Sequence, residues 1–142
     1  MPQAGDAGIS NVELRLTGTD AAGNPINIVA VPSGPNGGSY EFRNVPPSAP
    51  GGYTITETQP ANLAPGKANA NNHPGTAQAG GNVITGVTVA GTNPPLTQGE
   101  YYFGELTPAG ISGRVYYDRD GNGAQGAPAT EPGLAGVTIT LT

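Results

Sequence analysis

The sequence contains no cysteine, a single histidine and few charged residues. Without cysteine, the 142-residue chain can form neither disulfide bonds nor a thiol-based active site. Five lysine and arginine residues stand against ten acids, so the net charge is −5. Nucleic acids and anionic membranes both attract proteins through a basic patch, because such a patch neutralises phosphate groups. The composition therefore argues against nucleic acid and against a membrane surface as partners.

The chain also lacks any long hydrophobic run. No stretch of 18 apolar residues occurs, so we predict no membrane-inserted helix. The residues from Met1 to Gly5 do not contain the apolar segment of a secretion signal. We expect any export signal to lie outside this chain.

Glycine and proline are abundant, with 24 and 15 residues, and they interrupt nearly every stretch long enough for a helix. Each proline inside a helix costs about 3 kcal/mol, so a helical fold is not expected. Apolar residues instead alternate with polar ones, which is typical of β-strands with one buried face. The alternating positions are Val12, Leu14, Leu16; Ile26, Ile28, Ala30; Tyr40, Phe42, Val45; Tyr53, Ile55; Val83, Ile84, Val87, Val89; Tyr101, Phe103; Val115, Tyr117; and Val137, Ile139, Leu141.

These segments predict an antiparallel β-sandwich of about seven to eight short strands. Residues 20–25 and 33–38 contain the glycine and asparagine typical of hairpin turns, because both residue types accept a positive φ. Residues 61–81 are rich in asparagine, proline, glycine and alanine, and we expect a long surface loop there.

The C-terminal segment repeats the pattern of the N-terminal one. Residues 8–17 (GISNVELRLT) align with residues 133–142 (GLAGVTITLT) at an offset of 125 residues, with four of ten pairs identical. A strand matched at a fixed offset indicates a tandem repeat. We therefore predict a β-sandwich repeat over residues 1–107, and the opening strand, acidic loop and second strand of a further repeat over residues 108–142.

An acidic loop over residues 118–123 (DRDGNG) is the sharpest local motif. Asp118, Asp120 and Asn122 alternate, and a tight loop turns such side chains toward one point, as in known calcium loops. The carbonyl of Ala124 and a bidentate Glu131 could complete a shell of hard oxygen ligands, which suits Ca²⁺. We expect a structural site with a dissociation constant of about 10⁻⁴–10⁻³ M. The alternative is a polar hairpin turn, since Asp, Asn and Gly are common turn residues.

Several ordered blocks of the chain resemble a known family. Residues 113–123 (GRVYYDRDGNG) and 131–137 (EPGLAGV) are similar to its opening pattern. Residues 40–47 (YEFRNVPP) and 53–57 (YTITE) are similar to its middle, and residues 101–106 (YYFGEL) to its closing strand. The family is that of the SdrD B-like repeats, the B-type repeats of serine–aspartate repeat surface proteins, which are related to Cna-B modules.

The resemblance implies a Greek-key sandwich of the Ig-like or prealbumin-like kind, with bound Ca²⁺. It also implies a non-catalytic role in stalks or adhesins on the bacterial cell surface. Carried over to this chain, Asp118, Asp120, Asn122 and Glu131 would be metal ligands. Gly126 stands where the family often has another Asp, and about two extra residues precede Glu131, so we expect a lower affinity.

Related Cna-B modules form a Lys–Asn isopeptide bond beside a buried glutamate. Glu57 occupies the family's glutamate position, but the strand at residues 12–17 has no lysine, and Lys67 falls in the predicted loop. We therefore expect no isopeptide bond, and interpret Glu57 as a polar strand residue or a hydrogen-bonding partner near the end of the sheet.

The sequence also bears on two other functions, those of an enzyme and of a ligand-binding module. His73, the single histidine, lies in the predicted loop, and no motif brings a serine and an acid to it, so we expect no enzyme. An adhesin module that binds a glycan or a matrix protein remains the alternative, because the six tyrosines could provide a stacking platform.

The phase of the repeat suggests how copies connect. The opening-strand pattern at residues 113–117 has no counterpart in the first unit, so we expect an open sheet edge there. The equivalent segment of a neighbouring copy could fill that edge by strand addition, and head-to-tail contacts of this kind build a filament. The alternative is that the next unit simply continues the same polypeptide.

Overall fold

The structure is a computed structural model that describes residues 5–32, 37–91 and 99–142. Seven β-strands and no helix occur in these residues, which confirms the all-β prediction. Nor do these residues contain a helix long and apolar enough to cross a membrane. The chain forms two compact units, Met1–Pro108 and Ala109–Thr142, and all seven strands lie in the first.

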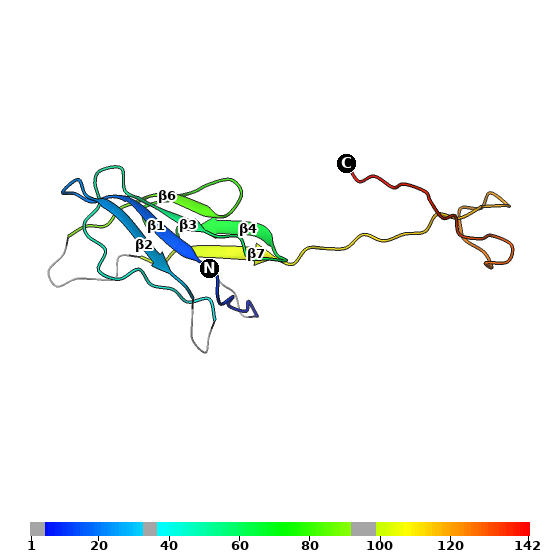
Figure 1. Ribbon diagram of the computed structural model, residues 1–142, viewed down its shortest axis with the longest axis horizontal. Helices are drawn as coiled ribbons and strands as arrows, with labels where there is room; N and C mark the ends of the chain where they lie inside the picture. The colour runs from blue at the N-terminus through cyan, green and yellow to red at the C-terminus, as the bar shows by residue number, and fades with distance from the viewer. Residues whose placement is uncertain (1–4, 33–36, 92–98) are drawn as a thin grey trace. The chain divides into compact units, whose positions relative to one another are not determined.

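Five strands of the first unit form one antiparallel sheet, in the order β2-β1-β3-β6-β5. The other two, β4 and β7, pair antiparallel in a second sheet (Figure 1). The strands are β1 Leu14–Thr19, β2 Pro25–Ala30, β3 Tyr53–Glu57, β4 Ala64–Asn69, β5 Thr76–Ala77, β6 Val83–Val87 and β7 Tyr102–Leu106.

The β1–β2 hairpin follows directly from the sequence. Leu14 and Leu16 face inward and are each only 2% exposed, while Arg15 between them points outward and forms an ion pair of 2.7 Å with Glu13. Asp20 holds the turn, because its Oδ1 accepts hydrogen bonds from the N–H groups of Ala22 (2.9 Å) and Asn24 (2.8 Å). This turn sets the register that pairs Leu14 with Ala30.

The centre of the core lies between β3 and β6. Tyr53, Ile55 and Ile84 are its most deeply buried large side chains. The register between the two strands shifts between Tyr53 and Ile55, opposite Gly86, which adopts a φ of 70°. Such a bulge bends the strand.

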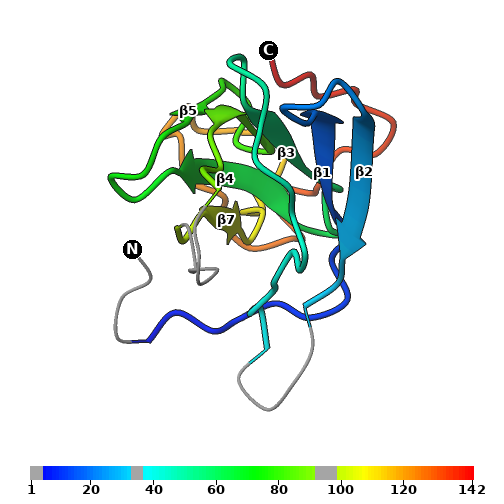
Figure 2. The ribbon, with the colours of Figure 1, turned by 90° about the vertical axis from the view of Figure 1, so that its left-hand side faces the viewer.

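The second sheet packs on the first through small and aromatic side chains. Ala68 of β4 and Phe103 of β7 contact the buried cluster formed by β1, β3 and β6. Figure 2 shows the β4–β7 pair lying apart from the β1–β2 hairpin, so that two layers are visible. The arrangement is consistent with a β-sandwich.

The prediction of a surface loop over residues 61–81 was wrong, because β4 and β5 lie within it. Their sequences contain no large apolar residue that would signal a strand. Gly66 of β4 instead lies so close to the carbonyl of Gly104 on β7 that a Cβ would collide with it. Small residues allow the backbones to approach here, and that approach is invisible to hydrophobic periodicity.

Residues 40–45 were predicted as a strand and do not form one. Tyr40, Phe42 and Val45 nevertheless pack against the core, as the alternation predicted. Asn44 adopts a φ of 54°, which interrupts extended backbone. The Tyr40 hydroxyl donates to the carbonyl of Tyr101 at 2.7 Å and anchors this segment in place of a strand ladder. The turn predicted at residues 33–38 falls largely outside the described residues.

The second unit is an irregular hairpin. Of its two predicted strands, the one at residues 115–117 contributes a single bridge, between Tyr116 and Gly133, and residues 137–141 form no strand. Ile139 and Leu141 are 74% and 83% exposed. A lone strand gains no ladder of hydrogen bonds, and within this unit residues 137–141 have no partner strand.

Candidate metal centre

The hairpin of the second unit brings the two ends of the acidic loop together. The N–H of Tyr117 donates to the carbonyl of Pro132 at 3.0 Å, and the N–H of Leu134 donates to that of Val115 at 2.9 Å. These bonds flank the Tyr116–Gly133 bridge. Because the two bridged segments run antiparallel, the residues just after Tyr117 lie beside those just before Pro132.

Backbone N–H groups converge on the carboxylate of Asp118. Gly121 and Asn122 donate to its Oδ1 at 2.8 and 3.2 Å, and Gly123 donates to its Oδ2 at 2.9 Å. The two glycines have φ values of 69° and 74°, a left-handed conformation that glycine adopts without strain. The hydrogen bond from Gly123, with those from its neighbours, lowers the pKa of Asp118 below its usual range, so this carboxyl is ionised at neutral pH.

Glu131 is the buried acid of the hairpin, with only 4% of its surface exposed. Its Oε1 accepts from the N–H of Arg119 at 3.2 Å, and its Oε2 accepts from the N–H of Gly126 at 2.5 Å. The side-chain amide of Gln125 donates to its carbonyl at 3.2 Å. Both carboxylate oxygens of Glu131 are therefore held by backbone N–H groups of the loop, which ties its end to its beginning and middle.

Three of the five predicted ligands lie together. Asp118, Asp120 and Glu131 each present one carboxylate oxygen, and these oxygens lie within 4.8 Å of one another. Asn122 adjoins the group through its side-chain Nδ2, which donates to Oδ2 of Asp120 at 2.8 Å. Ala124 enters the loop through its N–H, which donates to Oδ1 of Asn122 at 2.6 Å. For Asn122 to offer oxygen to a cation, its amide must turn over.

The backbone donors around Glu131 were not anticipated from the sequence. In the sequence, Gly126 is only a position where the family often has an aspartate. In the structure, its N–H donates a hydrogen bond to the Glu131 carboxylate. A Cβ at Gly126 would lie 3.2 Å from Oε2 of Glu131, so this position faces the acid directly. Main-chain hydrogen bonds depend on how the loop closes, and no residue pattern records that.

Glu57, the residue considered for an isopeptide bond, lies at the end of β3 and is buried. Lys67 lies on β4 with its side chain exposed. The charged group beside Glu57 is Glu105 of β7, whose carboxyl interacts with that of Glu57. The Glu57–Glu105 pair, which the sequence did not predict, is a contact between the two sheets.

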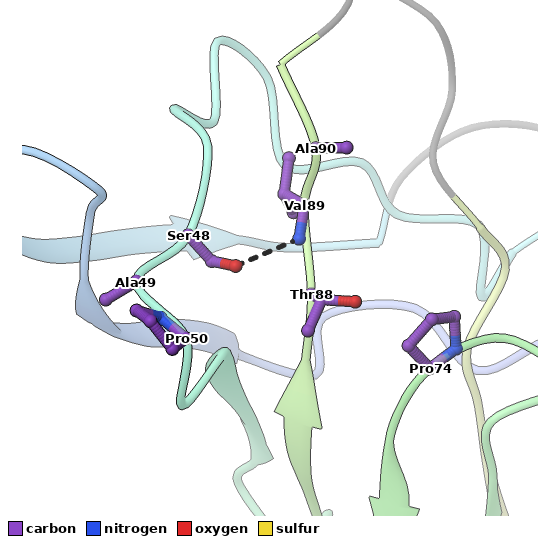
Figure 3. A pocket seen from close by; sticks show the side chains of 7 residues that line it. All are labelled: Ser48, Ala49, Pro50, Pro74, Thr88, Val89 and Ala90. Atoms are coloured by element: carbon purple, nitrogen blue, oxygen red, sulfur yellow. Dashed lines mark hydrogen bonds between the residues drawn. The ribbon is translucent and has the colours of Figure 1, made fainter.

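The described part of the first unit also has a shallow hollow of about 410 Å³. Figure 3 shows that its lining is made of small and apolar side chains, and that the hydroxyl of Ser48 accepts a hydrogen bond from the N–H of Val89, at 3.2 Å. The lining residues are Ser48, Ala49, Pro50, Pro74, Thr88, Val89 and Ala90. None of them is an acid or a histidine that could activate the serine.

The tyrosines differ in how far they are exposed. Tyr53 is fully buried in the core, with its hydroxyl donating to the carbonyl of Pro46 at 3.1 Å. Tyr101 is half-buried, its hydroxyl bonded to the carbonyl of Pro74 and its ring 6.0 Å from that of His73. Tyr117 of the second unit is more than half exposed. Tyr53 is therefore not available for stacking against a ligand.

No family model, no curated protein and no solved structure matches this chain. Membership of the SdrD B-like family, which the sequence blocks suggest, consequently stays a prediction. The function is therefore inferred from the residues of this chain.

Proposed function

We propose that this protein is a calcium-stabilised, non-catalytic structural repeat of an extracellular stalk or fibre on a bacterial surface. The observation that carries the proposal is the acidic hairpin, in which three carboxylates from opposite ends of a loop lie within 4.8 Å of one another. The finer assignment of the fold, an Ig-like or prealbumin-like Greek-key sandwich, belongs to the same proposal. It is supported by the chain passing between the two sheets, from β3 to β4 and from β6 to β7.

The chemistry of the hairpin favours calcium over other metals. Its donors are all carboxylate and amide oxygens, which are hard ligands, and cysteine is absent. Three carboxylates at this distance repel one another in the absence of a cation. Bound Ca²⁺ would remove that repulsion, so metal binding and folding of the hairpin are coupled. Asp118, Asp120, Glu131 and, after rotation of its amide, Asn122 would hold the ion.

The comparison between the two units supports an array. Val12, Leu14 and Leu16 are buried in the first unit. The matching Val137, Ile139 and Leu141 of the second unit are exposed, with alternating polar residues between them. Side chains with this pattern belong on the inner face of a sheet, so they require neighbouring strands. A neighbouring repeat, either in the same polypeptide or in another copy, would provide them.

Amide hydrogen exchange of the full chain, measured with and without Ca²⁺, tests the proposal. We expect millimolar Ca²⁺ to slow exchange at the N–H groups of Arg119, Gly121, Gly123 and Gly126, which bond the carboxylates. The variant Asp118→Asn keeps a hydrogen-bond acceptor but loses the charge, and should lose this protection.

The control is Glu41→Gln, which removes an exposed acid paired with Arg43 in the first unit and should respond to Ca²⁺ like the wild type. If Ca²⁺ leaves exchange in residues 116–134 unchanged in the wild type, the calcium-stabilised repeat is ruled out.

A further inference from the structure

A second group of polar side chains lies between the two sheets of the first unit. Glu57 of β3 and Glu105 of β7 meet there, joined by the amides of Gln59 and Asn82. Gln59 donates its Nε2 to Oε2 of Glu105, and Asn82 donates its Nδ2 to Oε1 of Gln59 at 2.8 Å. The N–H of Glu57 donates to the carbonyl of Asn82 at 2.8 Å, which closes the group. We call these four residues the inter-sheet cluster.

Three oxygens of the inter-sheet cluster are buried without a hydrogen-bond donor in the structure. They are Oε2 of Glu57, Oε1 of Glu105 and Oδ1 of Asn82. Glu57 as a whole is only 7% exposed. Buried acceptors normally find a partner, because an unsatisfied one costs about 1–3 kcal/mol, and more when it is charged. Three such oxygens in one cluster indicate that the cluster binds a ligand that all three can contact.

Among the described residues of the first unit, no lysine or arginine forms an ion pair with this cluster. The unit's arginines are engaged elsewhere: Arg15 bonds Glu13 and Asn27 on the outer face of β1 and β2, and Arg43 bonds Glu41. Lys67, the unit's single lysine, is exposed on β4. The carboxyl groups of the cluster are therefore left without a positively charged partner among these residues.

We propose that Glu57, Glu105 and Asn82 form a second binding site for a hard divalent cation, of which Ca²⁺ is the best candidate. Two carboxylates and an amide oxygen are the donor set that such ions prefer. A proton shared between the two carboxyls would supply a donor to one of the orphan oxygens and leave the amide oxygen of Asn82 unsatisfied. A cation held by these oxygens would satisfy all three and would neutralise the carboxylates.

Equilibrium dialysis of the full chain with ⁴⁵Ca²⁺ at pH 8 tests this site. The loop variant carries Asp118→Asn and Asp120→Asn, the cluster variant carries Glu57→Gln and Glu105→Gln, and a third variant carries all four changes. We expect two ions per wild-type chain, one in the loop variant, one in the cluster variant and none in the third. Thermal unfolding followed by circular dichroism checks that each variant is folded, and Glu41→Gln serves as the matched control.

The outcomes separate this proposal from the proposed function. A folded loop variant that binds no Ca²⁺ overturns the inter-sheet site and reduces the cluster to a carboxyl pair sharing a proton. A cluster variant that binds none, while the loop variant still binds one, overturns the hairpin site instead. If the loop variant does not fold, the number of ions bound by the wild type is compared with the number bound by the cluster variant. One ion bound by each of them overturns the inter-sheet site.

Discussion

At the scale of single residues, backbone N–H groups hold the two acids Asp118 and Glu131. Asp118 accepts three such bonds and Glu131 two, all from residues of the loop between them. These bonds fix the positions of the two carboxylates within the loop. Carboxylates fixed by short local bonds lose little conformational freedom on binding, which favours a cation site over a flexible acidic loop.

Gly126 offers a way to strengthen the hairpin site. A Cβ there lies 3.2 Å from Oε2 of Glu131, and its φ is not in the left-handed region, so an aspartate is sterically allowed after a shift of a few tenths of an ångström. We expect Gly126→Asp to raise Ca²⁺ affinity on the order of tenfold, because affinity rises with the number of charged ligands. Isothermal titration measures it.

The control for that variant is Ala127→Asp, which adds the same charge at an exposed neighbouring position. It should change the affinity far less. Equal affinities for the two variants would mean that overall charge, and not ligation beside Glu131, governs binding.

Glu57 makes stability depend on pH. Its pKa is raised from 4.5 to about 7 in the folded protein, first by burial and then by Glu105. Below pH 4.5 both folded and unfolded chains hold the proton, so the contribution of Glu57 to stability is fully present. Between pH 4.5 and about 7 the unfolded chain releases that proton while the folded chain keeps it, so the free energy of unfolding falls over this range, by up to about 3 kcal/mol in all by the time the pH has passed 7.

Chemical denaturation in a metal chelator, at intervals from pH 4 to pH 8, measures this effect. The difference in unfolding free energy between the wild type and Glu57→Gln isolates it from the other acids. We expect that difference to shift against the wild type as the pH rises. A difference that stays level over this range would show that Glu57 titrates normally.

At the scale of elements, close backbone approach decides where strands meet. Gly52 precedes β3 with a φ of 70°, and a Cβ there would lie 2.7 Å from the carbonyl carbon of Gly86 and 2.9 Å from the nitrogen of Val87. These are backbone atoms at the end of β6, which cannot rotate away. The bulge between β3 and β6 therefore depends on glycine at this position.

We expect Gly52→Ala to lower the free energy of unfolding by about 2 kcal/mol or more, because it adds both steric overlap and backbone strain. Gly51→Ala is the matched control, since a Cβ at Gly51 meets nothing within 4 Å and its φ is not positive. That change should stay within about 1 kcal/mol. Urea denaturation measures the free energy of unfolding of both variants. Equal losses of stability would show that the effect comes from the lower flexibility of alanine and not from steric overlap at Gly52.

At the scale of the whole molecule, the two units differ in how far they bury their apolar residues. The first has a core of Leu14, Leu16, Tyr53, Ile55, Ile84 and Val87. In the second unit, all of whose residues are described, Glu131 is the only buried residue. The segment of this unit at residues 137–141, which has the sequence pattern of a strand, is exposed. A protein built from such units gains stability when neighbouring repeats pair.

Assembly is therefore expected to depend on this exposed segment. In millimolar Ca²⁺, at rising protein concentration, the wild type should form elongated oligomers, visible by sedimentation and negative-stain microscopy. Ile139→Asp places a charge on the apolar face and should abolish them, while Thr138→Asp on the other face should not. Compact monomers of the wild type at all concentrations would argue against strand exchange between separate copies and leave covalent continuation as the way repeats pair.

Much of this protein is determined by local sequence. The alternation at Leu14 and Leu16, the turn at Asp20, and the spacing of Asp118 and Asp120 are local patterns, so they predicted an antiparallel all-β fold and an acidic loop. Strand period and turn chemistry act over a few residues, which is why they can be identified without knowing the rest of the chain.

Only the tertiary structure decided the remainder. β4 pairs with β7 where Gly66 and Gly104 let the two backbones approach, and residues 40–45 are held by a tyrosine hydroxyl where a strand was expected. The pairing of Glu57 with Glu105 joins residues from two sheets that are distant along the chain. Contacts of this kind depend on how the layers pack, and packing is a property of the whole fold that no short segment encodes.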